Sequence, residues 1–420
     1  MSGKKRYARP VSIIGVGQTD FTTDPELSWH ELFTWAAQDA MEDAGINPRQ
    51  IDQLIVPNFS MWPFMGNSTS IHVALADWIG MTGKPVQRHE EGCASGYIAI
   101  EEAAKAVASG VSDIVLICSV EMSEFGSLAN QPAHMLKPIN ELPRFDASGT
   151  LNDPAYARFD GASNNMVFDM DMRYYASKHN LSDQTIDDIL SHYAISTRRN
   201  ASLNPHANQR KLYSELATEM GFDNEMDYLR SKYNPHMSHY LRVSHMSKRV
   251  NAAAAIIVCA ADVADSFKQK PVEILGCGVG CYSTGVPHYM LKQTKVAIDS
   301  VLELTGIHSD ELDYLQCCDM HAGEILETLE LLGYLGTDGY GAILEGQTAY
   351  DGCHPINADG GYLSRGHAYA ASGLANLKEV VLQMRGQAGQ RQIKKQPHTA
   401  LLWGWGGSHS SIATMLRTQG

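Results

Sequence analysis

The chain has little positive charge and few charged residues of any kind. Its 420 residues include 33 Lys and Arg against 47 Asp and Glu, giving a formal net charge of −14, and only 19% of them are charged. A nucleic-acid partner is not expected, because binding a phosphate backbone needs clustered basic side chains. The hydrophobic fraction of 44% predicts a globular protein rather than a disordered one.

Long apolar runs and dense cysteines are also missing. No apolar run reaches the roughly 20 residues that span a bilayer, and residues 1–10 are too polar for a secretory leader. Eight cysteines are too few for a disulfide scaffold. The pairs Cys277/Cys281 and Cys317/Cys318 have no second ligand pair at a zinc spacing, so no metal site is expected. We therefore expect a cytoplasmic protein without a membrane span.

An internal repeat is the main organisational feature. Residues 10–17 (PVSIIGVG) match residues 271–278 (PVEILGCG), and at the same spacing Gly45 matches Gly306 and residues 51–54 match 312–315. Each copy predicts a buried strand, a helix ending at Gly, a turn and a second strand. The glycine pairs after the first strands imitate a dinucleotide-binding turn, but we interpret them as a turn of the repeat. The pattern predicts an α/β fold of two similar halves related by a pseudo-twofold axis.

A stretch of different composition, residues 122–246, separates the halves. It is rich in Met, Asn, His and Tyr and is expected to form a loop or lid domain. Helices are predicted over 168–179 and 185–199, the latter capped by Ser182 or Asp183. Residues 1–121 then form the first part of the N-terminal half, 247–270 its return strand, and 271–420 the C-terminal half.

Cys93 is the first candidate for chemistry. It lies in the segment 91–96 (EGCASG), directly before a helical pattern over 97–109. Unpaired N–H groups and the helix dipole at a helix N-terminus stabilise a thiolate. Most single cysteines are core residues, whereas a turn of small residues favours a nucleophile. Spacing alone leaves both interpretations open.

Three further segments could join Cys93. The loop 357–373 leads into a helix that mirrors the Cys93 helix, so the pseudo-twofold would bring His367 toward Cys93, although a lone His in a glycine loop is usually a surface or capping residue. The glycines of segment 403–409 (WGWGGSH) would let backbone N–H groups reach a ligand oxygen, although a plain turn is the alternative. Segment 317–321 (CCDMH) ends a buried strand, which fits an active-site floor or a structural network equally.

These motifs resemble the thiolase superfamily, and most closely its sterol-carrier-protein-type branch, over nearly the whole chain. The segments that carry the resemblance are 354–367 (HPINADGGYLSRGH), 382–389 (LQMRGQAG), 92–96 (GCASG) and 199–205 (RNASLNP). The resemblance implies a duplicated, five-layered αβαβα fold with an inserted loop domain. It implies that Cys93 is the acylated nucleophile, that His367 activates it, and that the N–H groups of Cys93 and Gly406 form an oxyanion hole.

Two departures from the family pattern concern the second acid/base. Gly404 stands where ordinary thiolases have a second Cys, as it does in the sterol-carrier-type branch. The His-Asp-Cys-Phe motif of that branch reads Cys318-Asp319-Met320-His321 here. We therefore expect Cys318 or His321 to be the second acid/base. A coenzyme A thioester is the expected substrate, no bound cofactor is expected, and the residues expected to contact the thioester are Ser364, Tyr369 and Asp319.

Three functions compete. The first is a thiolase-like acyltransferase that forms a Cys93 acyl-enzyme and passes the acyl group between an acyl-CoA or acyl ketone and a carbon nucleophile. The resemblance extends to acylphloroglucinol C-acyltransferase subunits. The second is a thiolase-like aldolase on β-hydroxyacyl-CoA, which would use tyrosines such as Tyr369 and a zinc-ribbon/OB-fold partner protein. The third is a non-catalytic subunit of a thiolase complex, and in every case a homodimer or larger assembly is expected.

Overall fold

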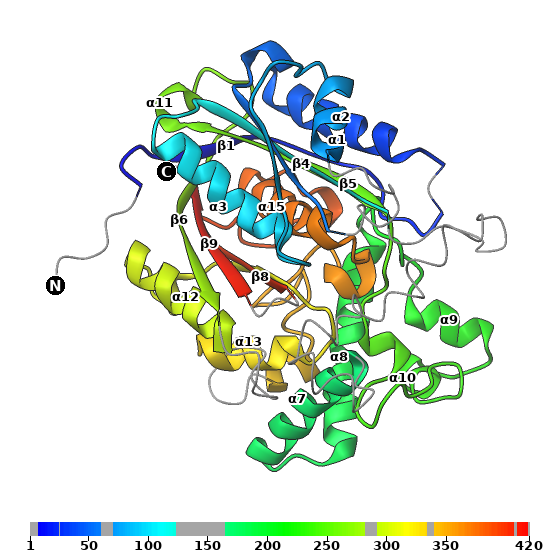
Figure 1. Cartoon of the computed structure of the whole chain (residues 1–420). Helices are drawn as coiled ribbons and strands as arrows, with labels where there is room; N and C mark the ends of the chain where they lie inside the picture. Colours follow the sequence, from blue (N-terminus) through cyan, green and yellow to red (C-terminus); the bar gives the residue numbers. More distant parts are fainter. Residues whose placement is uncertain are drawn as a thin grey trace, which may run out of the picture.

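The computed structural model of the protein describes residues 7–24, 26–59, 70–122, 164–281, 292–333, 340–406 and 410–418. These residues form five layers (Figure 1). From one outer face to the other, the helical layers are α1 (Trp29–Ala44) with α2 (Ile71–Trp78), then α3 (Ser95–Ala108) with α15 (Tyr369–Arg385), and finally α12 (Lys292–Thr305) with α13 (Glu324–Leu332). Two sheet layers lie between them, so the predicted αβαβα fold is confirmed.

One mixed sheet supplies both β layers. Its strands are β1 (Val11–Gln18), β2 (Gln53–Pro57), β3 (Val86–His89), β4 (Ile114–Glu121), β5 (Ala252–Ala260), β6 (Val272–Cys281), β7 (Tyr314–Cys317), β8 (Thr399–Gly406) and β9 (Ser410–Thr418). They run in the order β3-β2-β4-β5-β1-β6-β9-β8-β7. β1 and β6 are antiparallel neighbours, with Val11 opposite Ile274 and Ile13 opposite Val272. The two halves therefore meet along the first strand of each.

Apolar cores separate the layers. One core lies between α1, α2 and the first half of the sheet, and another surrounds α3 and α15 at the centre. A further core packs α12 and α13 on the second half and extends into the insertion. The helix boundaries follow local capping rules: Ser28 and Glu31 form a capping box at the start of α1, and Gly45 ends it with φ 74°.

The predicted repeat is confirmed in three dimensions. β1, α1, the short helix η1 (Pro48–Gln50) and β2 recur in the same order as β6, α12, η4 (Ser309–Glu311) and β7. The central helices α3 and α15 cross where a Cβ on Gly96 would lie only 2.2 Å from the Ala370 carbonyl oxygen and 3.3 Å from the Cα of Gly373. The dipeptide Ser-Gly occurs near the start of both helices, as Ser95-Gly96 in α3 and Ser372-Gly373 in α15, so the pseudo-twofold axis passes near this crossing.

The glycine pairs of the repeat lie inside strands and form no turn. A Cβ on Gly17 of β1 would lie 2.3 Å from the carbonyl oxygen of Ala36 in α1. A Cβ on Gly278 of β6 would lie 2.1 Å from the carbonyl oxygen of Ala297 in α12. Each glycine thus lets a strand approach the backbone of its covering helix. The interpretation as a repeat turn is wrong, because it took a close-packing requirement for a change of chain direction.

The insertion contributes helices beside the second half of the sheet (Figure 1). They are α7 (Asn164–His179), α8 (Asp183–Ser202), α9 (Tyr213–Glu219) and α10 (Glu225–Leu229). α7 and α8 confirm the two helices predicted in this stretch. Ser182 caps α8, as expected, by accepting the Thr185 N–H. Residues 123–163 of the predicted insertion lie outside the described residues, and its boundaries stay a prediction. The remaining short helices are η3 (Val243–His245), α11 (Ala261–Ala264), α14 (Tyr340–Leu344), η5 (Gly361–Arg365) and η6 (Gly389–Arg391).

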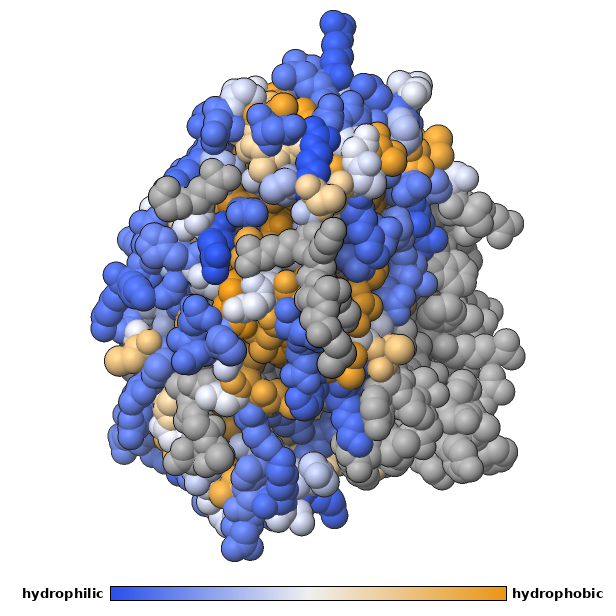
Figure 2. Space-filling model, turned by 90° about the vertical axis from the view of Figure 1, so that its left-hand side faces the viewer, coloured by the Kyte–Doolittle hydropathy of each residue, from blue (hydrophilic) through white to orange (hydrophobic). Residues whose placement is uncertain are grey.

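The outer surface is hydrophilic at its rim and apolar at the centre of one face. Figure 2 shows this face, which is the left-hand side of Figure 1, where β6 and α12 lie. Each of these elements exposes a valine, Val279 at 42% and Val296 at 45%. Within the described parts of the chain, none of the helices combines the length and the apolar content needed to cross a membrane.

Candidate active site

Cys93 lies in a tight turn between β3 and α3. The Ala94 N–H donates to the Glu91 carbonyl at 3.0 Å and the Ser95 N–H to the Gly92 carbonyl at 3.2 Å. The Ser95 hydroxyl also accepts the Glu91 N–H at 2.8 Å. These bonds fix the turn, and the side chain of Cys93 packs against the core of the second half. The nucleophile candidate therefore faces the interface of the two halves.

The resting Cys93 is a neutral thiol. Burial raises its pKa to about 12, and the carboxyl groups of Glu121 and Glu324 act in the same direction when they are ionised. Arg249 and a backbone hydrogen bond act in the opposite direction, but they do not offset the burial. A pKa of about 12 runs against the expected thiolate, and the role of Cys93 as a nucleophile stays a prediction. Cys93 precedes α3 in a partly exposed position, and the cost of desolvating a charge there exceeds the help from a helix end.

His367 lies at the end of the turn that leads into α15. Its Nδ1 is 3.2 Å from the Ser372 hydroxyl, which also accepts the Ala368 N–H at 2.7 Å. Its ring stacks on Tyr362 at 4.4 Å between centroids. Nε2 is buried and has no hydrogen-bond partner among the described residues. Burial, with Arg365 and Arg249 nearby, lowers the pKa of His367 to about 3, so a neutral imidazole presents an unused nitrogen.

Arg249 brings Cys93, His367 and Tyr369 together. The Arg249 backbone pairs with that of His367 in an isolated bridge. Its guanidinium hydrogen-bonds the Tyr369 hydroxyl and acts on the pKa of all three side chains. The charge of an ionised Cys93 would raise the pKa of Tyr369. The backbone of Tyr369 has a φ of 36°, in the left-handed region that non-glycine residues rarely adopt. The predicted nucleophile, the predicted base and Tyr369 therefore share one site.

Gly404 and Gly406 of β8 border this site for different steric reasons. A Cβ on Gly404 would lie 2.1 Å from the Tyr97 ring, which fills the space beside this glycine. The Tyr97 hydroxyl in turn bonds the hydroxyl of Tyr362 at 2.7 Å and thereby supports the ring stacked on His367. A Cβ on Gly406 would lie 2.4 Å from the Glu91 carbonyl oxygen, so Gly406 lies against the Cys93 turn as expected.

Cys318 approaches Cys93 from the second half. It follows β7 directly, and its N–H donates to the Trp403 carbonyl at 3.1 Å. Its thiol is fully buried and hydrogen-bonds the Glu324 carboxyl group. Ionisation of Cys93 would raise the pKa of this thiol. Burial raises the pKa of Cys318 well above its ordinary value. The expected role of Cys318 as a second acid/base stays a prediction.

His321 lies behind Cys318 and stacks on Phe168 at 4.6 Å between centroids. Its Nδ1 accepts the Gly323 N–H at 3.2 Å, which leaves the proton of the neutral ring on Nε2. Nε2 is 3.8 Å from the Glu324 carboxylate oxygen Oε1. Burial lowers the pKa of His321 to about 3. These contacts direct His321 toward Glu324.

Asp319 and Ser364 have protein partners for their polar atoms. The Asp319 carboxylate accepts the Tyr362 N–H at 2.6 Å and the Tyr193 hydroxyl at 3.1 Å. The Ser364 hydroxyl is 3.2 Å from the Thr197 hydroxyl of α8. Both side chains thus hold the loop before His367 in place. The expected thioester contacts of Asp319, Ser364 and Tyr369 stay a prediction, and these bonds show only how Asp319 and Ser364 are held.

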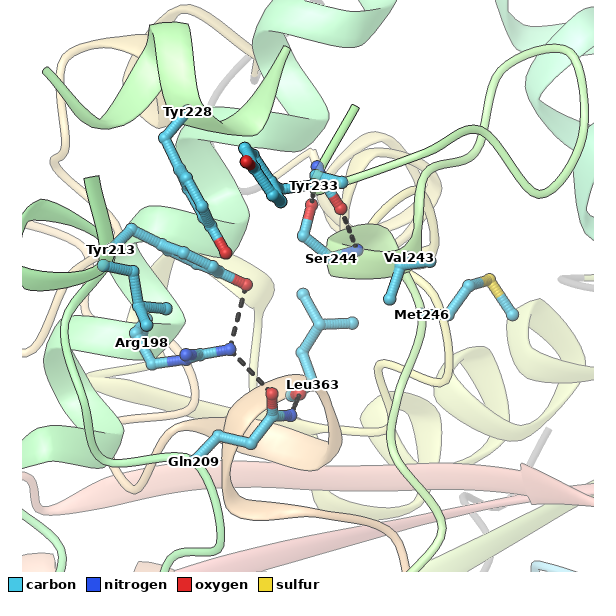
Figure 3. A pocket seen from close by; sticks show the side chains of 11 residues that line it. Arg198, Gln209, Tyr213, Tyr228, Tyr233, Val243, Ser244, Met246 and Leu363 are labelled. Carbon is cyan, nitrogen blue, oxygen red and sulfur yellow. Dashed lines mark hydrogen bonds between the residues drawn. The ribbon is translucent and has the colours of Figure 1, made fainter. Parts of the chain in front are cut away.

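A cavity of about 160 Å³ lies in the insertion behind this loop (Figure 3). Its lining residues are Arg198, Gln209, Tyr213, Leu216, Tyr228, Tyr233, Asn234, Val243, Ser244, Met246 and Leu363. Arg198 donates to Gln209 at 2.7 Å, and Gln209 donates to the Leu363 carbonyl at 3.0 Å. Leu363 belongs to the π-helical turn η5, so the cavity wall is tied to the segment that presents His367. Neither Cys93 nor His367 lines the cavity.

Two carboxyl groups meet between α7 and α13, one helical turn beyond Glu324. Asp171 is 2% exposed, and one of its carboxylate oxygens has no hydrogen-bond partner among the described residues. Burial raises the pKa of Asp171, further helped by the charge of Glu327, and burial also raises the pKa of Glu327 to about 8. An acid whose pKa is higher in the folded state binds more protons there, so folding is favoured at low pH.

The pH dependence of stability tests this pair. The contribution of Glu327 is complete below the ordinary Glu pKa and is lost as the pH rises to about 8. We expect Glu327→Gln to unfold at a temperature ~2–5 °C above wild type at pH 9 and at a similar temperature at pH 5. Thermal unfolding across this range measures it, with the exposed Glu303→Gln as the control that keeps the wild-type slope. Parallel curves for Glu327→Gln and wild type would contradict the assignment.

No group of three or more His, Cys, Asp or Glu side chains in the described parts of the chain is arranged to hold a metal ion. Of the cysteine pair considered for metal, Cys281 is exposed and Cys277 is 3.4 Å from the Thr414 hydroxyl. The remaining residues of the 403–409 segment, 407–409, lie outside the described residues.

Sequence reasoning missed Arg249, Glu324 and Tyr97. Arg249 is a single basic residue before an apolar strand, and Glu324 is one of several acidic residues on its helix. Tyr97 reads as an ordinary apolar position of α3. A possible signal for Tyr97 was Gly404, because a glycine in a buried strand often marks the close approach of another group.

Comparison with known proteins identifies the class. Residues 11–216 match the family described as thiolase, N-terminal domain, and residues 283–418 match thiolase C-terminal domain-like. The chain belongs to the thiolase family, as the sequence motifs predicted.

Similarity to individual proteins extends over nearly the whole chain. It is 28% identical over 392 residues to the acetyl-CoA acetyltransferase of Methanothermobacter thermautotrophicus, covering 92% of this chain and 94% of that protein. Sterol carrier protein 2 of Gallus gallus is 26% identical, with 92% and 68% covered. The 17-hydroxy-3-oxo-4-pregnene-20-carboxyl-CoA lyase of Mycobacterium tuberculosis is 27% identical, with 89% and 91% covered. The solved Ltp2-ChsH2(DUF35) aldolase has the same fold, with a TM-score of 0.74, 19% identity and 98% of both chains covered.

Proposed function

We propose that the protein is an acyltransferase that forms a covalent acyl-enzyme on Cys93. One observation carries this proposal: a neutral thiol and a neutral imidazole with an unpartnered Nε2 lie around a single guanidinium, Arg249. A thiol of high pKa needs a base at the moment of attack, and a buried imidazole whose other nitrogen is held by Ser372 is such a base. The similarity to an acetyl-CoA acetyltransferase supports a coenzyme A thioester as the acyl donor.

In the proposed acylation, the Cys93 sulfur bonds to the carbonyl carbon of the thioester. The thiol proton passes to Nε2 of His367, while Nδ1–H donates to the Ser372 hydroxyl. The carbon–sulfur bond to coenzyme A then breaks, and the proton on Nε2 goes to the departing thiolate. The N–H groups of Cys93 and of Gly406, whose strand β8 ends against the Cys93 turn, would stabilise the oxyanion of the intermediate.

The acyl group then passes to a carbon nucleophile in our proposal. Carbon–carbon bond formation needs a second group that takes a proton from carbon. Two observations support Cys318 in this role. Its pKa responds to the charge of Cys93, and its thiol hydrogen-bonds the Glu324 carboxyl group. An electron-rich aromatic ring is one acceptor class, because its carbon is nucleophilic without a strong base. Acyl ketones are the corresponding donors for the reverse transfer.

A lyase acting on β-hydroxyacyl-CoA is the second candidate. Tyr369 favours it, because its hydroxyl lies beside Cys93 and binds Arg249, as a tyrosine acting on a substrate hydroxyl would require. The relative from Mycobacterium tuberculosis is itself named a CoA lyase. Retention of Cys93 favours transfer.

Assembly into a homodimer or larger complex is also proposed. The apolar centre of the face in Figure 2 supports an interface between chains, because contiguous apolar surface is uncommon on monomers. A zinc-ribbon/OB-fold protein is a further proposed partner, supported by the similarity in fold to an aldolase that is solved together with ChsH2.

The variant Tyr369→Phe separates the two activities. It keeps the ring against Phe59, 5.0 Å away, and removes only the hydroxyl. For a transferase we expect the rate of acyl adduct formation from acetyl-CoA to change by less than ~5-fold, as intact mass spectrometry measures. For a lyase, release of aldehyde or ketone from a β-hydroxyacyl-CoA would fall ~100-fold or more. Tyr174→Phe, exposed at 46%, is the matched control. Wild-type cleavage without any adduct from acetyl-CoA or an acylphloroglucinol would overturn the transferase proposal.

A further inference from the structure

Glu324 is a fully buried carboxyl group beside the proposed second acid/base. It opens α13, and none of its surface is exposed. Its Oε2 accepts the Met320 N–H at 3.0 Å. Its Oε1 has no hydrogen-bond partner among the described residues and lies 3.8 Å from Nε2 of His321, which also has none. Buried polar atoms without a partner are rare in native proteins, and beside a titratable group of shifted pKa they mark a candidate functional site.

The surroundings favour the uncharged form of this carboxyl. The titratable groups that act on it are Cys93, Cys317, Cys318, Asp319 and Glu327, and the Cys318 thiol hydrogen-bonds it. Burial raises the pKa of Glu324 well above its ordinary value, and the charges of Asp319 and Glu327 act in the same direction. His321 remains neutral, so it offers an N–H toward Oε1 rather than a positive charge. The cluster can hold one exchangeable proton behind Cys318.

We propose that Glu324 stores the proton that Cys318 delivers to carbon when a carbon–carbon bond is cleaved, and that it takes the proton back in the condensation direction. This inference rests on the proposed acyl transfer and assigns a residue that the sequence motifs do not indicate. Glu324 acts through Cys318 and is therefore a positioning residue. In this proposal the Nε2–H of His321 orients the Oε1 atom of Glu324, from which it lies 3.8 Å away.

The step balances in both directions. When the Cys93 sulfur bonds to C3 of a 3-oxoacyl thioester, the thiol proton goes to His367 and the C2–C3 bond breaks. The bonding electron pair stays on C2, which takes the proton of the Cys318 thiol. Glu324 passes its own proton to the Cys318 sulfur and becomes a carboxylate. Condensation reverses each transfer, and no oxidant or reductant is involved. To complete turnover in the cleavage direction, the thiol of free coenzyme A takes the acyl group from Cys93, its proton restores the Cys93 thiol, and the proton held by His367 returns to Glu324 through solvent.

Infrared difference spectroscopy tests the stored proton without any substrate. At pH 7 the spectrum of wild type minus Glu324→Gln should contain the carbonyl band of a protonated carboxylic acid. Glu327→Gln is the matched control, because it lies one turn further along α13, and it should retain the Glu324 band. Ionised carboxylate bands in place of the acid band would overturn the proposal, whatever the activity of the protein.

Kinetics with acetyl-CoA and acetoacetyl-CoA test the transfer. Glu324→Gln should form the Cys93 adduct from acetyl-CoA within ~3-fold of the wild-type rate, yet cleave acetoacetyl-CoA ~100-fold more slowly. The wild-type cleavage rate should fall as the pH rises through the raised pKa of Glu324, because cleavage needs the acid form. Glu324→Asp should recover part of the rate. Equal losses in adduct formation and cleavage would show a merely structural role. If wild type reacts with neither thioester, the proposed function fails, and the infrared result still decides the state of Glu324.

Discussion

Cys93→Ala is expected to abolish the acyl adduct that wild type forms with acetyl-CoA. The adduct is a thioester on this sulfur, so removing the sulfur removes the bond itself. Any remaining turnover should fall by ~1000-fold or more, because turnover would then lack covalent catalysis. Intact mass spectrometry after incubation with acetyl-CoA measures the adduct, and peptide mapping locates it.

Two controls make this result specific. Cys281→Ala removes an exposed thiol at the end of β6 and should leave the adduct unchanged. Cys93→Ser preserves the size of the side chain in the tight turn and should also form no thioester. An adduct of undiminished yield in Cys93→Ala would place the nucleophile elsewhere and remove the basis of the acyltransferase proposal.

His367→Asn is expected to slow adduct formation by ~100- to 10,000-fold without abolishing it. The nucleophile remains in this variant, but its thiol, with a pKa of about 12, loses the base that takes its proton. Ser372→Ala is the graded comparison. It removes only the hydroxyl held 3.2 Å from Nδ1 and should cost ~10-fold.

The pH profile distinguishes this pair from a preformed ion pair. His367 has a pKa of about 3 and Cys93 one of about 12, so both are neutral throughout the range between them. The wild-type acylation rate should therefore be nearly constant from about pH 5 to about pH 9. A thiolate–imidazolium pair would instead give a bell-shaped profile with limits inside this range, and observing one would contradict the assignment.

The duplicated fold and its principal pair could be predicted from the sequence for a physical reason. A repeat that preserves strand, helix and turn spacing fixes the pairing of the halves, and Cys93 and His367 both precede matched central helices. The charge state of the pair could not be predicted. It depends on how completely α3, α15 and the insertion enclose the thiol, and sequence spacing carries no information on burial by distant segments.

The roles within the segment 318–324 show the same limit. The motif position predicted Cys318 as an acid/base candidate, and its place beside Cys93 supports it. Glu324 could not be selected from the acidic residues of its helix, because only the packing of α13 turns it inward. Gly17 and Gly278 were misinterpreted for a related reason, since the sequence does not distinguish a turn from a strand pressed against a helix.

The way in which the halves join has a consequence for inactivation. β1 and β6 are paired over only three residue positions, and the apolar core around α3 and α15 adds further contact between the halves. These two helices also set the distance between the Cys93 sulfur and the His367 imidazole, because Cys93 lies just before α3 and His367 just before α15. A small slip along their crossing would misalign the two before either half lost its own core. Activity should therefore respond to a change at this interface before other properties do. On heating or in denaturant, we expect activity to be lost while most of the secondary structure is still intact.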